Sequence, residues 1–139
     1  MSRVVCYWDK VDSEKGLVYL AAIDEGLVYC STPGGKEDEM IKWVTKHLPD
    51  YALKEGSNNI LDLAKKQLID YFKRKGRILD VPMHFIGTSF QKSVWNALTT
   101  IPYGKTKTYG QIAASIGKPK APRAVGGANN KNPIALFVP

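Results

Sequence analysis

Between residues 105 and 131 the chain carries several cationic side chains and no carboxylate. A basic segment of this kind attracts phosphate groups, and nucleic acid is the commonest polyanionic partner of a basic domain. The whole chain points the same way, because 20 Lys and Arg against 13 Asp and Glu give a formal net charge of +7. Ordinary solubilising charge is the alternative, and composition alone leaves it open. The cations of the segment are Lys105, Lys107, Lys118, Lys120, Arg123 and Lys131.

A run of very small residues follows Arg123 and would leave a helix nearly bare. It comprises Ala124, Gly126, Gly127 and Ala128. Because each glycine inside a helix costs about 1 kcal/mol relative to alanine, an offsetting gain is expected. One explanation is close approach to another helix. The other is close approach to nucleic acid, whose minor groove, about 6 Å wide, admits a thin helix better than a bulky one.

Two short helices are predicted to hold these residues. Thr108 stands three residues before Gln111, which is the spacing of a capping box, and opens a helix that runs to about residue 116. Gly117 ends this helix. Pro122 then occupies the first turn of a second helix, which runs to about residue 130. Two short helices joined by a tight turn are typical of a helix-turn-helix.

A further helix is predicted just before this pair. Thr88 or Ser89 is suited to cap it, and apolar residues follow at helical spacing. Its buried stripe is expected to consist of Phe90, Val94, Trp95 and Leu98. The second half of the chain is therefore predicted to be mostly helical.

The first half has a different pattern. Residues 4–8, 17–21 and 27–31 alternate in the manner of strands, which places Val4, Cys6 and Trp8 on one face. Helices are predicted over residues 36–47 and 59–75. The buried face of the second of these helices is expected to comprise Leu61, Ala64, Leu68 and Tyr71. Strands followed by helices indicate a small α+β domain.

The two patterns meet near residues 80–87, where the helical period is lost and Pro82 interrupts the chain. We expect an N-terminal α/β domain over residues 1–83 and a C-terminal helical domain over residues 84–139. A chain of 139 residues can bury one good core or two small ones. The predicted fold class is α+β.

Three stretches of the second half are similar to a known protein family. They are residues 103–113 (YGKTKTYGQIA), 121–128 (APRAVGGA) and 132–139 (NPIALFVP). In these stretches the chain resembles the O6-alkylguanine-DNA (methylated-DNA–protein-cysteine) alkyltransferases. The resemblance is close over residues 88–139. In the first half of the chain it is limited to the general layout of strands and helices. It implies a ribonuclease-H-like α/β domain followed by a mostly helical domain with a winged helix-turn-helix.

The resemblance implies DNA repair by direct reversal. Such a protein flips O6-alkylguanine, and O4-alkylthymine, out of duplex DNA and transfers the alkyl group irreversibly to its own cysteine. It is a methylated-DNA–[protein]-cysteine S-methyltransferase that acts once. The acceptor cysteine is expected directly after Pro139, so no catalytic residue is expected within the chain. Cys6 and Cys30 lie in predicted strands, where cysteine is often buried as a small hydrophobic residue.

The resemblance also implies roles for single residues. Tyr109 would crowd the phosphate beside the target nucleotide, help to rotate it outward and donate a hydrogen bond to the guanine. Arg123 would enter the base stack through the minor groove and fill the gap. The implied DNA-binding set is Tyr109, Arg123, Ala124, Gly126, Gly127, Ala128 and Lys131. The implied substrate pocket is lined by Tyr109, Asn132, Ala135, Val138 and Pro139.

Plainer explanations stay open for each of these residues. Tyr109 could equally be a half-buried aromatic residue at the start of a helix. Arg123 could equally contact a phosphate or be a solvated charge. Asn132 fits a simple turn, because a short amide side chain bonds to neighbouring backbone. Residues 134–139 are apolar enough for an ordinary core strand.

No cofactor and no metal are expected. Some members of the family hold structural zinc, but Cys6, Cys30, His47 and His84 do not have a recognisable zinc spacing. The expected partner is double-stranded DNA with O6-alkylguanine, bound by a monomer through the minor groove. No signal peptide and no apolar run of about 18 residues is visible, so a cytoplasmic protein without membrane contact is expected.

Two alternatives stay open, one in the same superfamily and one in a different class of protein. One is a non-catalytic alkyltransferase-like protein that binds the lesion and has another residue in place of the acceptor cysteine. The residue after Pro139 distinguishes it. The other is a helix-turn-helix regulator, which needs long polar side chains on its second helix for major-groove contacts, whereas residues 124–128 supply none.

Overall fold

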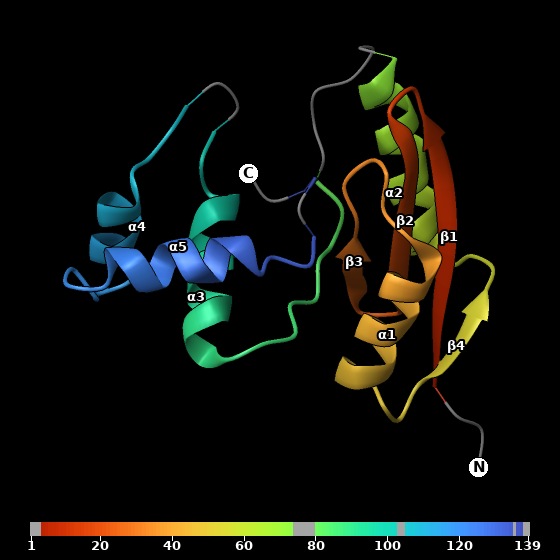
Figure 1. The fold of residues 1–139 in the computed structure, drawn as a ribbon, viewed down its shortest axis with the longest axis horizontal. Helices are drawn as coiled ribbons and strands as arrows, with labels where there is room; N and C mark the ends of the chain where they lie inside the picture. Colours follow the sequence, from red (N-terminus) through yellow and green to blue (C-terminus); the bar gives the residue numbers. More distant parts are fainter. Residues whose placement is uncertain (1–3, 74–79, 103–104, 135, 138–139) are drawn as a thin grey trace. The chain divides into compact units, whose positions relative to one another are not determined.

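The computed structural model describes residues 4–73, 80–102, 105–134 and 136–137 (Figure 1). By its internal contacts the chain divides into two compact units. The first extends to His84 and includes Pro133–Phe137, and the second comprises Phe85–Asn132. The predicted mixed α+β class is confirmed, because among the described residues the first unit holds a sheet with two helices and the second holds three helices. The domain limits predicted at 1–83 and 84–139 stay a prediction.

One four-stranded sheet forms the centre of the first unit. Its strands are β1 (Val5–Ser13), β2 (Gly16–Ile23), β3 (Gly26–Cys30) and β4 (Ala52–Glu55), in the order β3-β2-β1-β4. The first three pair antiparallel, and β4 lies parallel to β1. The three predicted strands are confirmed, and β4 is an addition to them.

Two helices, α1 (Glu37–His47) and α2 (Asn59–Phe72), lie on opposite faces of this sheet (Figure 1). As a result β2 is buried on both faces, with every residue from Val18 to Ile23 buried, so the predicted alternation of buried and exposed positions is wrong for this strand. Val4 precedes β1 and is 55% exposed, so it does not share the buried face of Cys6 and Trp8.

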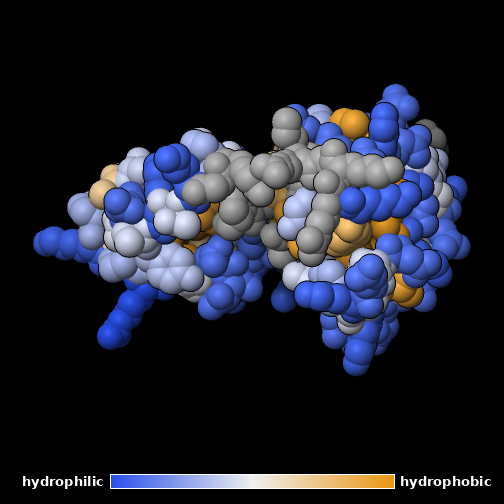
Figure 2. All heavy atoms as spheres, turned by 90° about the horizontal axis from the view of Figure 1, so that it is seen from above, coloured by the Kyte–Doolittle hydropathy of each residue, from blue (hydrophilic) through white to orange (hydrophobic). Residues whose placement is uncertain are grey.

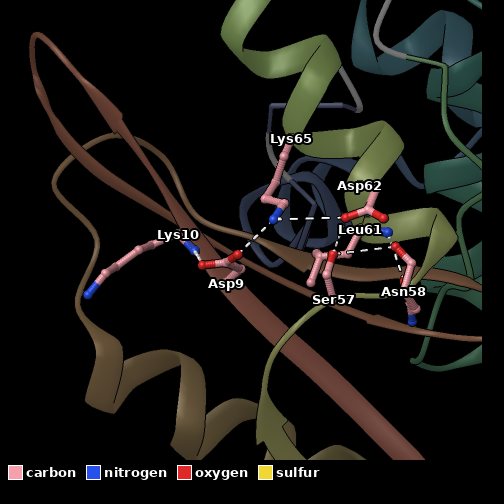
Figure 3. Close-up of polar contacts among 7 residues, drawn as sticks. All are labelled: Asp9, Lys10, Ser57, Asn58, Leu61, Asp62 and Lys65. Carbon is pink, nitrogen blue, oxygen red and sulfur yellow. Dashed lines mark hydrogen bonds and ion pairs between the residues drawn. The ribbon is translucent and has the colours of Figure 1, made fainter.

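Polar contacts fasten α2 to the sheet (Figure 3). The Lys65 ammonium forms an ion pair of 2.7 Å with Asp9 on β1. Burial opposes ionisation of this carboxyl, but the hydrogen bond and charge of Lys65 hold the pKa of Asp9 below its ordinary value. Asn58 caps the helix by accepting from the Leu61 N–H, and its amide donates to the Ala22 carbonyl on β2. The far end of α2 differs from the prediction, because Tyr71 is 41% exposed.

The second unit consists of α3 (Ser89–Thr99), α4 (Tyr109–Ser115) and α5 (Pro122–Asn130), which contact one another. The predicted capping box from Thr108 to Gln111 is present, and Thr88, one of the two residues suited to cap the preceding helix, forms a second capping box with Gln91. The turn after α4 contains Gly117 with φ +76°, a conformation that glycine adopts without strain, and Pro122 begins α5. These local signals explain why the predicted helices are confirmed here.

Trp95 joins α3 to α5. Its side chain is 1% exposed, and the indole N–H donates a hydrogen bond of 2.9 Å to the carbonyl of Ala128. Val94, Ile112 and Val125 complete the same core. The helix with the small residues is thus held from its inner side by one large aromatic residue.

Replacing Trp95 by phenylalanine is expected to lower the free energy of unfolding by about 0.5–1.5 kcal/mol, because the buried hydrogen bond from the indole to the Ala128 carbonyl is lost while that carbonyl keeps its bond from the Lys131 N–H. Urea denaturation measures the loss. Trp8→Phe is the matched control, since Trp8 is also buried but its indole donates no hydrogen bond among the described residues. Equal losses in the two variants would contradict the assigned role of the Trp95 hydrogen bond.

In the parts of the chain that the structure describes, no helix has the length and apolar character needed to cross a membrane.

Candidate nucleic-acid interface

The helix α5 has two distinct sides. Val125 and Ala128 face inward and are buried against the other helices. The outward residues recur at intervals of three and four, so they share one face of the helix. Two cations bracket small or short side chains on this outer face, which consists of Arg123, Ala124, Gly127, Asn130 and the capping residue Lys131.

Gly126 owes its small size to a contact inside the unit. A Cβ atom added there would lie 3.0 Å from Cε2 of Tyr109, at the start of α4. The Tyr109 hydroxyl also accepts a hydrogen bond of 3.4 Å from the side-chain amide of Asn129. Close packing against a neighbouring helix therefore explains this glycine, although the neighbour is a side chain and not a backbone.

Gly127 has no such explanation. A Cβ atom added there would meet no heavy atom within 4 Å, and its φ lies outside the left-handed region that favours glycine. A glycine in a helix interior without packing or backbone need lowers helix stability by about 1 kcal/mol relative to alanine. The outer face of α5 therefore carries a glycine for which the described part of the protein gives no structural reason.

Charge is distributed very unevenly between the two halves of the sequence. Residues 85–139 contain seven cations and no carboxylate, whereas residues 1–84 contain 13 of each sign and have no net charge. Lys105, Lys107, Lys118 and Lys120 are all exposed. No ion pair is present among the described residues of the second unit. Figure 2 shows long hydrophilic side chains projecting from the end of this unit.

The structure brings several predicted DNA-binding residues together. Tyr109 is 47% exposed and lies against Gly126, next to the outer face of α5. Arg123 is exposed in the first turn of that helix and forms no ion pair within the described residues. Ala128 differs from the others, because it is buried and its carbonyl is bonded to Trp95. Its small size is explained by packing against α3.

The predicted pocket is described only in part. Asn132 is half-buried just after α5, and its N–H donates to the Asn129 carbonyl at 3.2 Å, as expected of a turn. Ala135, Val138 and Pro139 lie outside the described residues.

Comparison with known proteins bears on this arrangement. A family model described as 6-O-methylguanine DNA methyltransferase, DNA binding domain, matches residues 89–139. A methylated-DNA–protein-cysteine methyltransferase of Methanosarcina acetivorans is 44% identical over 96% of this chain and 80% of its own length. An inducible methylated-DNA–protein-cysteine methyltransferase of Bacillus subtilis is 37% identical over 99% of the chain and 76% of its own length.

The chain belongs to the methylated-DNA–protein-cysteine methyltransferase family. A solved structure agrees with this assignment. Mycobacterium tuberculosis OGT in complex with DNA has a TM-score of 0.75 and 35% identity to this chain, covering 96% of it and 74% of that protein. The coverage includes both units of the fold.

In a methylated-DNA–protein-cysteine methyltransferase the state of each thiol matters. Cys6 and Cys30 are both free thiols, and they are 0% and 1% exposed. Burial raises the pKa of Cys6 to about 12, and it raises the pKa of Cys30 further still. The attacking group in thiol chemistry is the thiolate, so neither residue is suited to accept an alkyl group near neutral pH.

The Cys6 thiol is expected to make the protein less stable in alkali. In an unfolded chain a thiol ionises near a pKa of about 8.5. Because the folded pKa is raised, the stability that this thiol confers is full below that pH and is lost as the pH rises toward 12. The slope is about 1.4 kcal/mol per pH unit for one thiol.

Denaturant unfolding at a series of pH values tests this. Cys6→Ala is expected to lose stability less steeply than the unchanged protein above about pH 9. Val18→Ala changes a buried residue on the neighbouring strand without an ionisable group, so its curve should run parallel to that of the unchanged protein. Equal slopes for all three proteins would contradict the shifted pKa.

The residues weighed for zinc do not assemble in the structure. Among the residues that it describes, no group of three or more His, Cys, Asp or Glu side chains is placed to hold a metal ion. The His47 ring stacks on Trp43 at 4.4 Å, with Nδ1 2.9 Å from the Trp43 carbonyl, so helix packing explains it.

Asn129 is the residue of this surface that the sequence did not single out. Its partner Tyr109 lies 20 positions away, and no local motif links a helix-interior asparagine to a distant hydroxyl. Only the packing of α4 on α5 shows that this amide orients the tyrosine.

Proposed function

We propose that this protein binds duplex DNA through the outer face of α5, rotates an O6-alkylguanine out of the base stack, and repairs it by taking the alkyl group onto a cysteine. The observation that carries the proposal is the open space beside Gly127, on a helix flanked by Arg123 and Lys131. Family membership supports it, because the matched relatives are named methylated-DNA–protein-cysteine methyltransferases.

The bare outer face suits the minor groove. That groove is about 6 Å wide and presents few base-specific groups, so a helix without long side chains loses little readout there and gains a close approach. Cations around the helix then contact phosphates on either side of the groove. The seven cations of residues 85–139, unopposed by any carboxylate, supply that attraction.

In this proposal Arg123 and Tyr109 have different roles in extruding the base. Arg123 is exposed and unpaired among the described residues, so its guanidinium is available to enter the stack where the base has left. Tyr109 is held by Gly126 and Asn129, which fixes its ring beside the helix that enters the groove. A fixed ring suits the tasks of crowding the neighbouring phosphate and bonding the extruded guanine.

The chemistry requires extrusion, because the alkylated oxygen lies at the pairing edge of guanine, where no group of the protein can reach it in a stacked duplex. A thiolate attacks the alkyl carbon, an S–C bond forms, and the C–O6 bond breaks to leave the guanine anion, which takes up a proton equivalent to the one that the thiol lost. The family resemblance is our ground for proposing an acceptor directly after Pro139, and Cys6 and Cys30 are buried and kept protonated, which argues against either of them. The thioether is stable, so each molecule acts once as a methylated-DNA–[protein]-cysteine S-methyltransferase.

Finer features of the family belong to the same proposal. The strand order β3-β2-β1-β4, with β4 parallel to β1, supports a ribonuclease-H-like first unit. The pair α4 and α5 supports a helix-turn-helix, whose wing stays a prediction. Ala135, Val138 and Pro139 are proposed to line the pocket with Tyr109 and Asn132. Action as a monomer, cytoplasmic location and acceptance of O4-alkylthymine are proposed as well.

The two competing functions make different demands on α5. A regulator that reads the major groove needs long polar side chains along the helix, and between Arg123 and Asn129 the outer face has none. A non-catalytic lesion binder needs the same bare helix but no acceptor thiol, so only a transfer assay separates it from the repair protein.

Extrusion can be tested with fluorescence. The chain is added to a duplex that carries O6-methylguanine next to 2-aminopurine, a base whose emission rises when stacking is lost. We expect the emission to rise on binding and the affinity to fall with added salt, and we expect the minor-groove ligand netropsin to compete. Tight binding without a rise in emission, or binding that netropsin leaves unchanged, would contradict the proposal.

A further inference from the structure

The outer edge of β3, on the side away from β2, holds two chain segments that come from far along the sequence. At one end, the Leu27 N–H donates to the Pro82 carbonyl at 2.8 Å, and the Leu27 carbonyl accepts from the His84 N–H at 2.9 Å. Three positions further, the Cys30 N–H donates to the Pro133 carbonyl at 2.8 Å. Both segments run parallel to the strand, through bridges at Met83 and Ile134.

These two segments are the places where the chain leaves the first unit and returns to it. The first unit extends to His84 and resumes at Pro133, and everything between belongs to the helical unit. Strand residues are spaced about 3.3 Å apart, so the two attachment points lie about 10 Å apart along one strand. One short strand therefore bonds to the chain both before residue 85 and after residue 132.

The returning segment is firmly embedded in the first unit. Ile134 is 0% exposed and Phe137 is 4% exposed. The Phe137 N–H donates to the Ile134 carbonyl at 3.1 Å, which turns the chain directly after the bridge. The Leu136 backbone partly opposes the rise that burial causes in the pKa of the Cys30 thiol. This segment is thus held by the edge of the sheet and by the core beneath it.

We propose that the outer edge of β3 is a positioning element for alkyl transfer, which holds the chain at Pro133 and Ile134 and so restrains the segment that leads to the acceptor. The inference rests on the proposed function, which places the acceptor directly after Pro139. Reacting atoms must be held about 3–3.5 Å apart, and a misplacement of about 1 Å costs about 100-fold in rate. Hydrogen bonding to β3 restrains the chain that precedes the acceptor.

The first of the two attachments depends on Gly26. A Cβ atom added there would lie 2.9 Å from three backbone atoms of residues 82–84. Backbone cannot give way as a flexible side chain does, so the first attachment requires glycine at this position. Gly26→Ala is therefore expected to push residues 82–84 off the strand, while Ile134→Ala loosens the second attachment by emptying a buried position.

The test separates DNA binding from transfer, in the polypeptide that includes the position after Pro139. Single-turnover transfer is measured at saturating O6-methylguanine duplex, and the Kd for the same duplex is measured independently. Gly26→Ala and Ile134→Ala are expected to slow transfer by about tenfold to 100-fold while the Kd changes by less than about twofold. Faster amide hydrogen exchange at His84 and at Cys30 should mark release of the two attachments.

Two further variants complete the design. Val18→Ala removes a similar volume from the core of the same unit without touching the edge of β3, and is expected to lose stability but keep its transfer rate. Ile134→Val keeps most of the buried side chain, and its rate should lie near that of the unchanged protein. Faster amide exchange with an unchanged transfer rate, or equal slowing in Val18→Ala, would overturn the positioning role. Failure of the unchanged protein to transfer would instead reject the proposed function.

Discussion

Arg123→Ala is expected to slow alkyl transfer from duplex DNA by about 100-fold, and to leave transfer from the free O6-alkylguanine base unchanged. Unstacking and unpairing a base costs a few kcal/mol, and about 2.7 kcal/mol corresponds to 100-fold in rate. The side chain that fills the vacated space offsets this cost, whereas a free base needs no extrusion. Arg123 is exposed and has no ion pair among the described residues, so its loss should leave stability nearly unchanged.

Two control variants separate intercalation from charge. Arg123→Lys keeps the charge but not the planar group that stacks on a base, so it is expected to resemble Arg123→Ala in duplex transfer. Lys120→Ala removes an exposed cation at the turn before α5, and should weaken binding to any duplex and lower the salt slope by about 0.9. An undiminished rate on duplex DNA in Arg123→Ala, or an equal loss on the free base, would contradict the role.

Gly127→Leu is expected to stabilise the free protein and to weaken its binding to duplex DNA by about 100-fold. Leucine favours the helix interior over glycine by nearly 1 kcal/mol, and the space beside Gly127 is open to 4 Å for a Cβ atom. In the complex that space is proposed to hold the walls of the minor groove, which a leucine side chain would push away. Thermal unfolding and a duplex-binding titration measure the two opposite effects.

Gly126→Ala is the matched control on the same helix. Its Cβ atom would lie 3.0 Å from the Tyr109 ring, so stability is expected to stay level or fall. Gly127→Ala adds a single methyl group at the open position and should give a smaller version of the Gly127→Leu result. If Gly127→Leu bound duplex DNA as tightly as the unchanged protein, the outer face of α5 would not be the DNA contact.

The parts of the fold that the sequence predicted well are those with local causes. The capping boxes at Thr108 and Thr88 each need only residues three apart, and both are present. Pro122 at the start of α5 and Gly117 before it act through the conformations of single residues. Such signals act within one turn of chain, so the sequence alone was enough to place α3, α4 and α5.

The missed and mistaken features depend on distant partners. β4 has four residues, none of them buried, and it exists because it pairs with β1, whose residues lie about fifty positions earlier. The sequence of β2 predicts a half-buried strand, but in the fold helices from later in the chain cover both of its faces. Tyr71 has the right helical spacing, but at the end of α2 it lies beyond the part of the helix that is covered.

In the candidate site, too, features with local causes could be predicted and features that depend on distant residues could not. Basic charge, a bare helix and the family resemblance were all visible in the sequence, and Arg123 and Tyr109 followed from them. The sequence could not show whether packing or a ligand requires a given glycine. Gly126 and Gly127 are adjacent in sequence and differ only in what lies beside them. Asn129 and Gly26 likewise gain their roles from residues 20 or more positions away.

This protein is proposed to repair alkylated DNA by a single transfer onto its own cysteine. The most direct test is the intact mass of the polypeptide that includes the position after Pro139, after incubation with an excess of O6-methylguanine duplex. We expect each molecule to gain one methyl group and then to stop, with the gain located in the peptide that follows Phe137. Repeated turnover, or a methyl group on Cys6 or Cys30, would contradict this account.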